Sequence, residues 1–276
     1  MKNLKNKTVL ITGGARGIGK QIAIEFAAQG CNIIICDLDK SIFNKDNFKS
    51  NIEDIENFGV SCWGYNLDVT QYQDIVNIRK KILDNVGKID ILVNNAGVVF
   101  GGKFLDISID QHKLTYDVNT QGVVNMLHVF LKDLIDSQES HIVNIASASS
   151  FTALPSGATY ASSKASVSIL SESLRLELLK DGNQHVGMTI VSPAYVNTGM
   201  FNGVQEPRFI PMLTTKKLAT KIVQAVIKNK LLVLEPTFVK FIPLLKAILP
   251  RFLYDFVGDI LGGYNTMDLW KGHSKK

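Results

Sequence analysis

The sequence predicts an α/β fold: a doubly wound parallel sheet of about seven strands with helices on both faces, followed by an apolar helical extension. Short apolar runs alternate with helical patterns along most of the 276 residues, which is typical of a parallel sheet. A glycine-rich turn joins the first apolar run to the first helical pattern. The composition, 46% hydrophobic and 20% charged, suits one large domain with a sizeable core.

The expected strands are short apolar runs of the length that buried strands have. In order they are Val9–Ile11, Asn32–Cys36, Val60–Tyr65, Ile89–Val93, His141–Ile145, Val186–Val191 and Leu231–Leu234. The expected helices lie between them, at Ile18–Gln29, Asp74–Val86, Gln111–Leu134, Thr159–Leu179 and Lys216–Lys228. No internal repeat interrupts this order. We therefore expect one domain over residues 1–234 and an extension over residues 235–276 that packs on it.

Composition and charge exclude several classes of protein. The net charge of +5 comes without a long basic run, so nucleic acid is not expected as a partner. The three cysteines form no C-x-x-C pair and indicate small core residues in a reducing compartment. The five histidines lack metal-ligand spacing, and the first residues lack the apolar core of a signal peptide. We expect a cytoplasmic protein without a metal site.

The glycine-rich turn runs from Thr12 to Gly19, directly after an apolar run and directly before a helical pattern. Its spacing is G-x-x-x-G-x-G, with Gly13, Gly17 and Gly19 as the three glycines. A turn of this kind lets the backbone approach a pyrophosphate at the positive N-terminus of the helix. Arg16 and Ile18, between the glycines, are therefore also expected to contact a dinucleotide.

Tyr160 and Lys164 stand four residues apart in an expected helix and so share one face. A phenol ordinarily loses its proton near pH ~10. An adjacent ammonium favours the phenolate and lowers that pKa. The pair is therefore a candidate general acid/base, although Tyr and Lys also meet at this spacing by chance.

Four motifs, in the order that the family has them, now give the chain a clear resemblance to the short-chain dehydrogenases/reductases, from about residue 5 to about residue 230. They are Thr12–Gly19, Asn94-Asn95-Ala96-Gly97, the group Asn119, Ser147, Tyr160 and Lys164, and the loop Pro193–Thr198. That loop usually begins Pro-Gly, and Ala194 is a small departure. The resemblance implies a Rossmann-like fold, a nicotinamide cofactor, a homodimer or homotetramer, and interconversion of an alcohol with a ketone or aldehyde.

Asp37 bears on the choice of cofactor. It ends the second expected strand about twenty residues after the glycine turn, where an acid accepts hydrogen bonds from the adenosine ribose and repels a 2′-phosphate. Leu38 follows, where a phosphate-binding relative would often place a cation. Arg16 is compatible with either cofactor. We expect NAD rather than NADP.

The resemblance assigns the remaining cofactor contacts. Asp68 and Val69 would meet the adenine, although Asp68 would also suit a helix N-cap. Asn95 and Gly97 would lie against the ribose, where a glycine permits close approach. Val196 and Thr198 would meet the nicotinamide, as would Tyr160 and Lys164.

The same resemblance assigns the catalytic roles. Ser147 would hydrogen-bond the substrate oxygen, with Ser149 and Ser150 as neighbouring alternatives that the family's spacing to Pro155 disfavours. Tyr160 would transfer the proton. Lys164 would bind the nicotinamide ribose and lower the pKa of Tyr160. Asn119 would hold a water that connects Lys164 to solvent.

Three loops carry apolar residues suited to a hydrophobic alcohol or ketone. They are Val98, Val99 and Phe100; Phe151 and Leu154; and Tyr195, Met200, Phe201, Phe209 and Met212. Ordinary loop packing explains them equally well. The last set lies in a long stretch, from Ser192 to Thr215, of a kind that often forms a lid.

The extension after Leu234 has an apolar stripe, with Phe252, Phe256 and Ile260 at i, i+4 and i+8. Two prolines and several charges argue against a membrane-spanning helix. We expect the extension to pack over the pocket or against another subunit, while contact with a membrane interface is the other alternative. Two rival functions remain open: a dehydratase or epimerase on the same scaffold, and a cofactor-binding regulatory protein without turnover.

Overall fold

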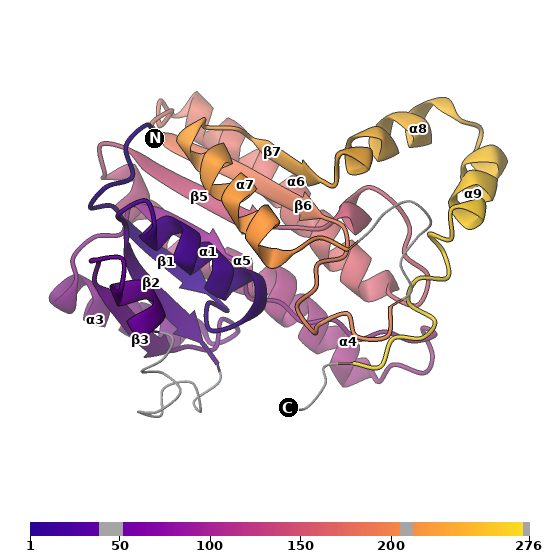
Figure 1. Cartoon of the computed structure of the whole chain (residues 1–276), viewed down its shortest axis with the longest axis horizontal. Helices are drawn as coiled ribbons and strands as arrows, with labels where there is room; N and C mark the ends of the chain where they lie inside the picture. Colours follow the sequence, from indigo (N-terminus) through magenta and orange to yellow (C-terminus); the bar gives the residue numbers. More distant parts are fainter. Residues whose placement is uncertain (39–51, 205–211, 273–276) are drawn as a thin grey trace.

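The computed structural model describes residues 1–38, 52–204 and 212–272 (Figure 1). Its centre is a seven-stranded sheet in the order β3-β2-β1-β4-β5-β6-β7, and these strands pair with their neighbours in parallel. The strands are β1 (Thr8–Thr12), β2 (Asn32–Asp37), β3 (Cys62–Asn66), β4 (Ile91–Asn94), β5 (Ser140–Ile145), β6 (Val186–Pro193) and β7 (Leu232–Glu235). This confirms the expected doubly wound α/β fold.

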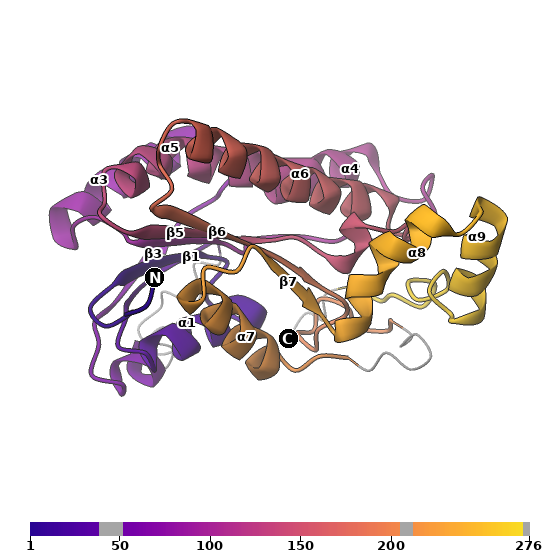
Figure 2. The same cartoon turned by 90° about the horizontal axis from the view of Figure 1, so that it is seen from above.

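Helices cover both faces of the sheet (Figure 2). One face carries α1 (Gly17–Ala27) and α7 (Thr215–Ile227), which pack against each other. The other carries α3 (Tyr72–Asn85), α5 (Gly122–Ile135) and α6 (Ala158–Lys180), with α4 (Ile109–Tyr116) beside α6. The alternation of side chains along β1 explains both cores, since Val9 and Ile11 join the α1/α7 side while Leu10 joins the other.

The expected single helix over Gln111–Leu134 is wrong in one respect. A π-helical turn, η2 (Asp117–Gln121), separates α4 from α5, and the amide of Gly122 donates to the carbonyl of Asp117 five residues earlier. The side-chain pattern is continuous, so periodicity could not locate the wider turn. Such insertions often occur at functional sites. Here the turn carries Asn119, whose side chain is fully buried.

The order of the strands places one crevice at the carboxyl edge of the sheet. The chain leaves β1 for β2 and β3 on one side and for β4 to β7 on the other, so β1 and β4 flank the point of reversal. Ligands of open α/β sheets bind outside the strand ends at such a point. Thr12, Asp37, Asn94 and Ile145 end their strands at this edge.

After β7 the chain forms η4 (Thr237–Phe241), α8 (Ile242–Ile248) and α9 (Arg251–Ile260). The two helices lie at one end of the molecule, beyond the sheet, in both views (Figures 1 and 2). An irregular segment, residues 261–272, then returns along the loops of the main domain. Within the described residues, no helix combines the length and apolarity needed to cross a bilayer.

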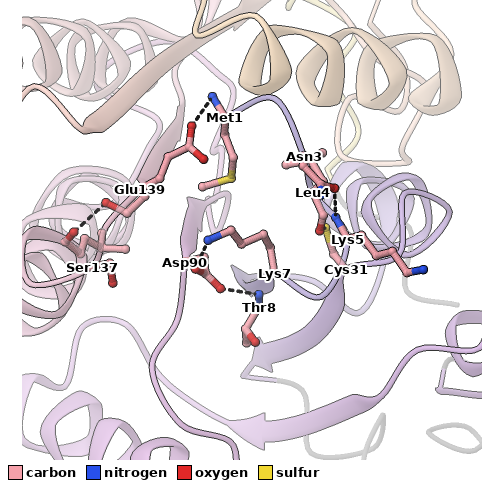
Figure 3. A network of polar contacts seen from close by, with 12 residues as sticks. Met1, Asn3, Leu4, Lys5, Lys7, Thr8, Cys31, Asp90, Ser137 and Glu139 are labelled. Carbon is pink, nitrogen blue, oxygen red and sulfur yellow. Dashed lines mark hydrogen bonds and ion pairs between the residues drawn. The ribbon is translucent and has the colours of Figure 1, made fainter.

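Polar contacts fix the first residues against the main domain (Figure 3). Lys7 pairs with Asp90 at 2.7 Å, and the other Asp90 oxygen accepts from the Thr8 amide at 2.8 Å. Cys31 is buried there, and its thiol donates to the Leu4 carbonyl. Burial raises the pKa of the Cys31 thiol to about 12, as suits a small core residue without redox chemistry.

Candidate active site

A cavity of about 880 Å³ lies at the carboxyl edge of the sheet and joins the motifs that the sequence singled out. The predicted residues that line it are Gly13, Arg16, Gly17, Ile18, Asp37, Asp68, Val69, Asn95, Gly97, Ser147, Tyr160, Lys164, Val196 and Thr198. Gly19 and Asn119 do not line the cavity, and they support residues that do. The sequence therefore predicted one contiguous site from segments distant along the chain.

The glycine-rich turn needs its three glycines for two reasons. Gly13 and Gly17 have φ of 62° and 58°, in the left-handed region that glycine adopts without strain. Gly19 has no room for a side chain, because a Cβ there would collide with the Gly13 carbonyl and lie 2.6 Å from Nδ2 of Asn95. The turn is therefore compact, and it leads directly into the N-terminus of α1.

Asn95 and Thr12 hold this turn in place. The Asn95 side chain donates to the carbonyls of Thr12 and Gly13, both at 2.9 Å. The Thr12 hydroxyl accepts from the amides of Asn95 and Ala96 at 3.0 and 3.1 Å. Asn95 thus holds the turn and also lines the cavity, and its expected contact with a ribose stays a prediction.

The two acidic residues of the cavity are positioned in different ways. One carboxylate oxygen of Asp37 accepts from the Ala15 amide at 3.1 Å, so the acid is tied to the glycine turn. Asp68 accepts from the amide and hydroxyl of Thr70 at 2.9 and 2.8 Å. Asp68 therefore does not cap α3, whose N-cap is Gln71 and has no side-chain capping bond; it stabilises the turn before the helix.

These residues fit a dinucleotide. The N-cap of α1, Arg16, makes no side-chain capping bond, and no acidic residue lies in the first turn. This leaves a helix N-terminus of the kind that binds phosphate. Asp37 lies across the turn, where a ribose hydroxyl could donate to it. Thr198 approaches Gly17 so closely that a Cβ on the glycine would lie 3.4 Å from its Cβ.

Ser147, Tyr160 and Lys164 meet deeper in the cavity. Tyr160 and Lys164 come from the first turns of α6, and Ser147 follows β5 directly. The Lys164 ammonium donates to the Ile145 carbonyl at 2.8 Å, which holds it at the end of β5. Ser147 is hydrogen-bonded to Tyr160 and also accepts from the Ser149 hydroxyl at 2.9 Å. Ser149 therefore supports Ser147.

The expectation that Lys164 lowers the pKa of Tyr160 is not met in this structure. Burial raises the pKa of Tyr160 to about 12, the hydrogen bond with Ser147 opposes the rise, and Tyr195 adds to it. Burial also lowers the pKa of Lys164 to about 8. Desolvation is the largest cause of both pKa shifts, because both groups are buried. Tyr160 is protonated at neutral pH, and can donate its proton to an acceptor.

Asn119 acts from behind the cavity. Its side chain exchanges two hydrogen bonds with the backbone of Val98, at 2.8 and 2.9 Å, and donates to the Ser163 hydroxyl at 3.0 Å. Gly97 lies between, since a Cβ there would be 3.2 Å from Oδ1 of Asn119 and 3.4 Å from Nζ of Lys164. Asn119 therefore positions the backbone that passes over Lys164.

The loop after β6 closes one side of the cavity. Val196 forms a parallel bridge with Leu213, which fixes the two ends of the loop to each other. Phe201 contacts both Tyr160 and Tyr195 edge to face, with ring centroids 6.0 and 5.2 Å apart. Five of the apolar residues expected at the substrate end line the cavity: Val98, Leu154, Tyr195, Met200 and Phe201. Two others, Val99 and Met212, pack behind it. Phe209 lies outside the described residues.

The extension supplies much of the apolar wall, which motifs could not assign residue by residue. Its cavity-lining residues are Phe238, Val239, Ile242, Leu245, Leu249, Tyr254, Val257, Gly258, Leu261, Gly263, Tyr264 and Thr266. Hydrogen bonds attach it to the main domain, from Tyr254 to Thr152 at 2.7 Å and from the Trp270 indole to the Met200 carbonyl at 3.1 Å. The apolar stripe in the sequence indicated that the extension packs against another surface, but it did not show which side of the helices faces the cavity.

Comparison with known proteins agrees with this arrangement. The family described as short chain dehydrogenase matches residues 7–208. Human short-chain dehydrogenase/reductase 3 is 34% identical over 278 residues, covering 99% of this chain and 89% of that protein. Mouse epidermal retinol dehydrogenase 2 is 29% identical, covering 100% and 88%. Mouse estradiol 17-beta-dehydrogenase 11 is 28% identical, covering 91% and 83%.

Solved structures share the fold. A short-chain dehydrogenase/reductase from Burkholderia phymatum in complex with NAD superimposes with a TM-score of 0.79 at 23% identity, covering 96% of this chain and 98% of that one. An alcohol dehydrogenase from Thermococcus sibiricus, complexed with 5-hydroxy-NADP, gives 0.70 at 25% identity, covering 83% and 94%. On the matched family and the sequence relatives, this chain belongs to the short-chain dehydrogenases/reductases, oxidoreductases that use a nicotinamide cofactor and act on the CH–OH group.

Proposed function

We propose that this protein interconverts a lipophilic alcohol and its ketone or aldehyde, with NAD as the preferred cofactor. The single observation that carries the proposal is the continuity of the cavity, which runs from the glycine turn past Ser147 and Tyr160 to the apolar wall of the extension. A dinucleotide end, a proton donor and a hydrophobic end are what hydride transfer to a lipophilic carbonyl needs. Residues 1–234 would form the catalytic domain, and residues 235–276 its extension.

The roles follow from chemistry and position. Bound at the glycine turn, the cofactor would supply the hydride. Ser147 would hold the substrate oxygen by a hydrogen bond, and Tyr160 would donate a proton to it during reduction and accept one during oxidation. Lys164, fixed by Ile145, would bind ribose hydroxyls and place positive charge near Tyr160. Asn119 would keep the Val98 backbone in position over Lys164.

The substrate end favours a large lipophilic molecule. The residues of the extension that line it are predominantly aliphatic and aromatic, and Tyr254, Tyr264 and Thr266 are the ones that carry a hydroxyl group. The named activities of two relatives, a retinol dehydrogenase and an estradiol dehydrogenase, concern alcohols of that kind. We therefore place the substrate among retinoid- or steroid-sized alcohols rather than sugars.

Asp37 supports NAD over NADP. Its carboxylate faces the cavity and is tied to Ala15, so a 2′-phosphate would meet a fixed negative charge. Leu38 follows with most of its side chain exposed and offers no compensating cation. We further propose a homodimer or homotetramer. The buried, unpaired cysteines support a reducing, cytoplasmic environment.

A substrate screen followed at the nicotinamide absorbance band tests the function. Retinoids, steroids, medium-chain alcohols and sugars would be offered with NAD and with NADP, to the parent protein and to Tyr160→Phe. The variant keeps the ring and loses the proton donor, so turnover should fall ~10²–10⁴-fold while cofactor binding persists.

Each rival function has its own result in this screen. A dehydratase or epimerase would convert substrate without a net change in absorbance. A regulatory protein would bind the cofactor and turn nothing over. A Tyr160→Phe variant within threefold of the parent would remove Tyr160 from the mechanism.

A further inference from the structure

The helices α8 and α9 are apolar on two opposite sides. The inward side lines the cavity, through residues such as Leu245, Leu249 and Val257. The outward side is exposed and consists of Phe241, Leu244, Ile248, Phe252, Leu253, Phe256 and Ile260, which we call the outer face. Phe252 is 76% exposed and Phe256 is 60% exposed. In a monomer exposed to water alone, a clustered apolar face of this kind is a liability, so it indicates an interaction surface.

The spacing of the outer face is regular. Phe241, at the N-cap of α8, and Leu244 and Ile248 within it follow the i, i+3, i+7 spacing. Phe252, Phe256 and Ile260 follow i, i+4, i+8 along α9. Both helices lie at one end of the molecule, clear of the sheet and its covering helices (Figure 2). The surface is therefore accessible to a large, flat partner.

The charges beside the outer face are few and nearly balanced. Arg251 pairs with Asp255 at 3.1 Å, and Asp255 also accepts from the Tyr264 hydroxyl at 2.9 Å. The Lys246 ammonium donates to the Phe151 carbonyl at 3.2 Å, on the cavity side. Exposed Lys240 and Asp259 remain, with opposite signs. The Asp255 carboxylate is thus paired, which limits its repulsion from anionic lipid headgroups.

We propose that the outer face docks α8 and α9 into the interfacial layer of a phospholipid membrane. Helices of 7 and 10 residues are too short to span it, but they can lie in its plane with aromatic and aliphatic side chains buried. A second copy of the chain fits less well, since a standard subunit interface takes about 20–30 residues a side and the outer face offers seven. The near balance of charge points to zwitterionic lipid as a sufficient partner.

The proposal has a consequence for substrate supply, which rests on the proposed function. The same two helices separate the outer face from the cavity by about one helix diameter, ~10 Å. A lipophilic alcohol dissolved in the membrane would then lie next to the wall of the cavity that receives it. This part fails if the protein has no alcohol substrate, whereas docking on lipid does not depend on turnover.

Co-sedimentation with phosphatidylcholine vesicles, in the absence of substrate and cofactor, tests the docking. The test variant is Phe252→Ser with Phe256→Ser, which changes only the outer face. The matched control is Leu105→Ser with Ile109→Ser, two apolar residues that are 93% and 71% exposed on another segment. We expect the affinity of the test variant for vesicles to be at least roughly tenfold lower than that of the parent. The control should bind vesicles like the parent.

Two further measurements keep the result interpretable. Phe252→Leu with Phe256→Leu should retain most vesicle binding, because the outer face stays apolar. Light scattering without lipid should give the same particle size for the parent and the serine variant. A parent that does not bind vesicles, a serine variant that binds like the parent, or a serine variant with a smaller particle would each overturn the proposal, the last by assigning the face to a subunit interface.

Discussion

The hydroxyl of Tyr195 donates a 2.6 Å hydrogen bond to Oγ1 of Thr266, which joins the loop after β6 to the C-terminal extension. Thr266 is 1% exposed, and Tyr195 contacts Phe201 edge to face, while Phe201 also contacts Tyr160. The bond therefore links the extension to the surroundings of the proposed proton donor. Hydrogen bonds of this kind stabilise by about 0.5–1.5 kcal/mol, and a buried hydroxyl left without a partner costs about 1–3 kcal/mol.

Thr266→Val should weaken the closure of the substrate end without touching the cofactor end. Valine keeps the shape and leaves the Tyr195 hydroxyl without its acceptor, so KM for a bulky lipophilic substrate should rise about three- to thirtyfold. Cofactor affinity should stay unchanged, since Asp37 and the glycine turn are remote in the cavity. Tyr195→Phe with Thr266→Val should cost no more than Thr266→Val alone; additive losses would show that the two residues act independently.

Asp37→Asn should shift cofactor preference toward NADP. Asparagine keeps an oxygen for the Ala15 amide but removes the charge that repels a 2′-phosphate. The ratio of kcat/KM for NAD to that for NADP should fall at least about tenfold. Asp68→Asn serves as the control, because its carboxylate is engaged by Thr70 and is expected near the adenine. A parent enzyme that already prefers NADP would contradict the assignment.

The sequence predicted the strands well, because buried parallel strands leave unbroken apolar runs. All seven appear within about three residues of their expected bounds, as with His141–Ile145 against Ser140–Ile145. The strand order came from the structure, which brings Gly13, Asp37 and Tyr160 together at the carboxyl edge of the sheet in one cavity. Residues of this kind can be recognised in a sequence, because few other amino acids have the backbone freedom or the functional group that the position requires.

Other features have no comparable signal in the sequence. The π turn at Asn119 changes the hydrogen-bond spacing without changing the side-chain pattern. The pKa of Tyr160 depends on how deeply the pair is buried, which spacing does not reveal. In the sequence, α9 is a single apolar stretch. Only the fold shows that Val257 faces the cavity while Phe256 is exposed to solvent.

Lys164 should give the rate a dependence on pH. Burial lowers its pKa to about 8, so the ammonium is present below that pH and is lost as the pH rises through it. Tyr160, with a pKa of about 12, stays protonated over the same range. For carbonyl reduction, kcat/KM should therefore be level below about pH 7 and fall above about pH 8.

Lys164→Arg provides the control for this profile, because a guanidinium keeps its charge to pH values above 12. The variant should be slower throughout but should lack the fall near pH 8. The measurement is the logarithm of kcat/KM across about pH 6–10. A parent profile that stays level to the alkaline end would show that Lys164 keeps its proton in the working enzyme and that burial does not control it.

Gly19→Ala should impair cofactor binding more than any other single methyl group added to the turn. A Cβ at this position meets the Gly13 carbonyl and the Asn95 amide, the two groups that hold the turn closed. Overpacking of this kind costs about 1–3 kcal/mol, so NAD affinity should fall about five- to 150-fold. Gly14→Ala is the matched control, since its Cβ would lie 3.1 Å from a methyl group of Ile35 and 3.2 Å from the Ile11 carbonyl, looser contacts than the collision of a Gly19 Cβ with the Gly13 carbonyl. NAD titration by fluorescence, beside a melting curve for each variant, separates loss of the site from loss of the fold. If Gly19→Ala binds NAD like the parent, the turn does not need the close approach of Gly13 and Gly19, and the proposed cofactor cradle is wrong.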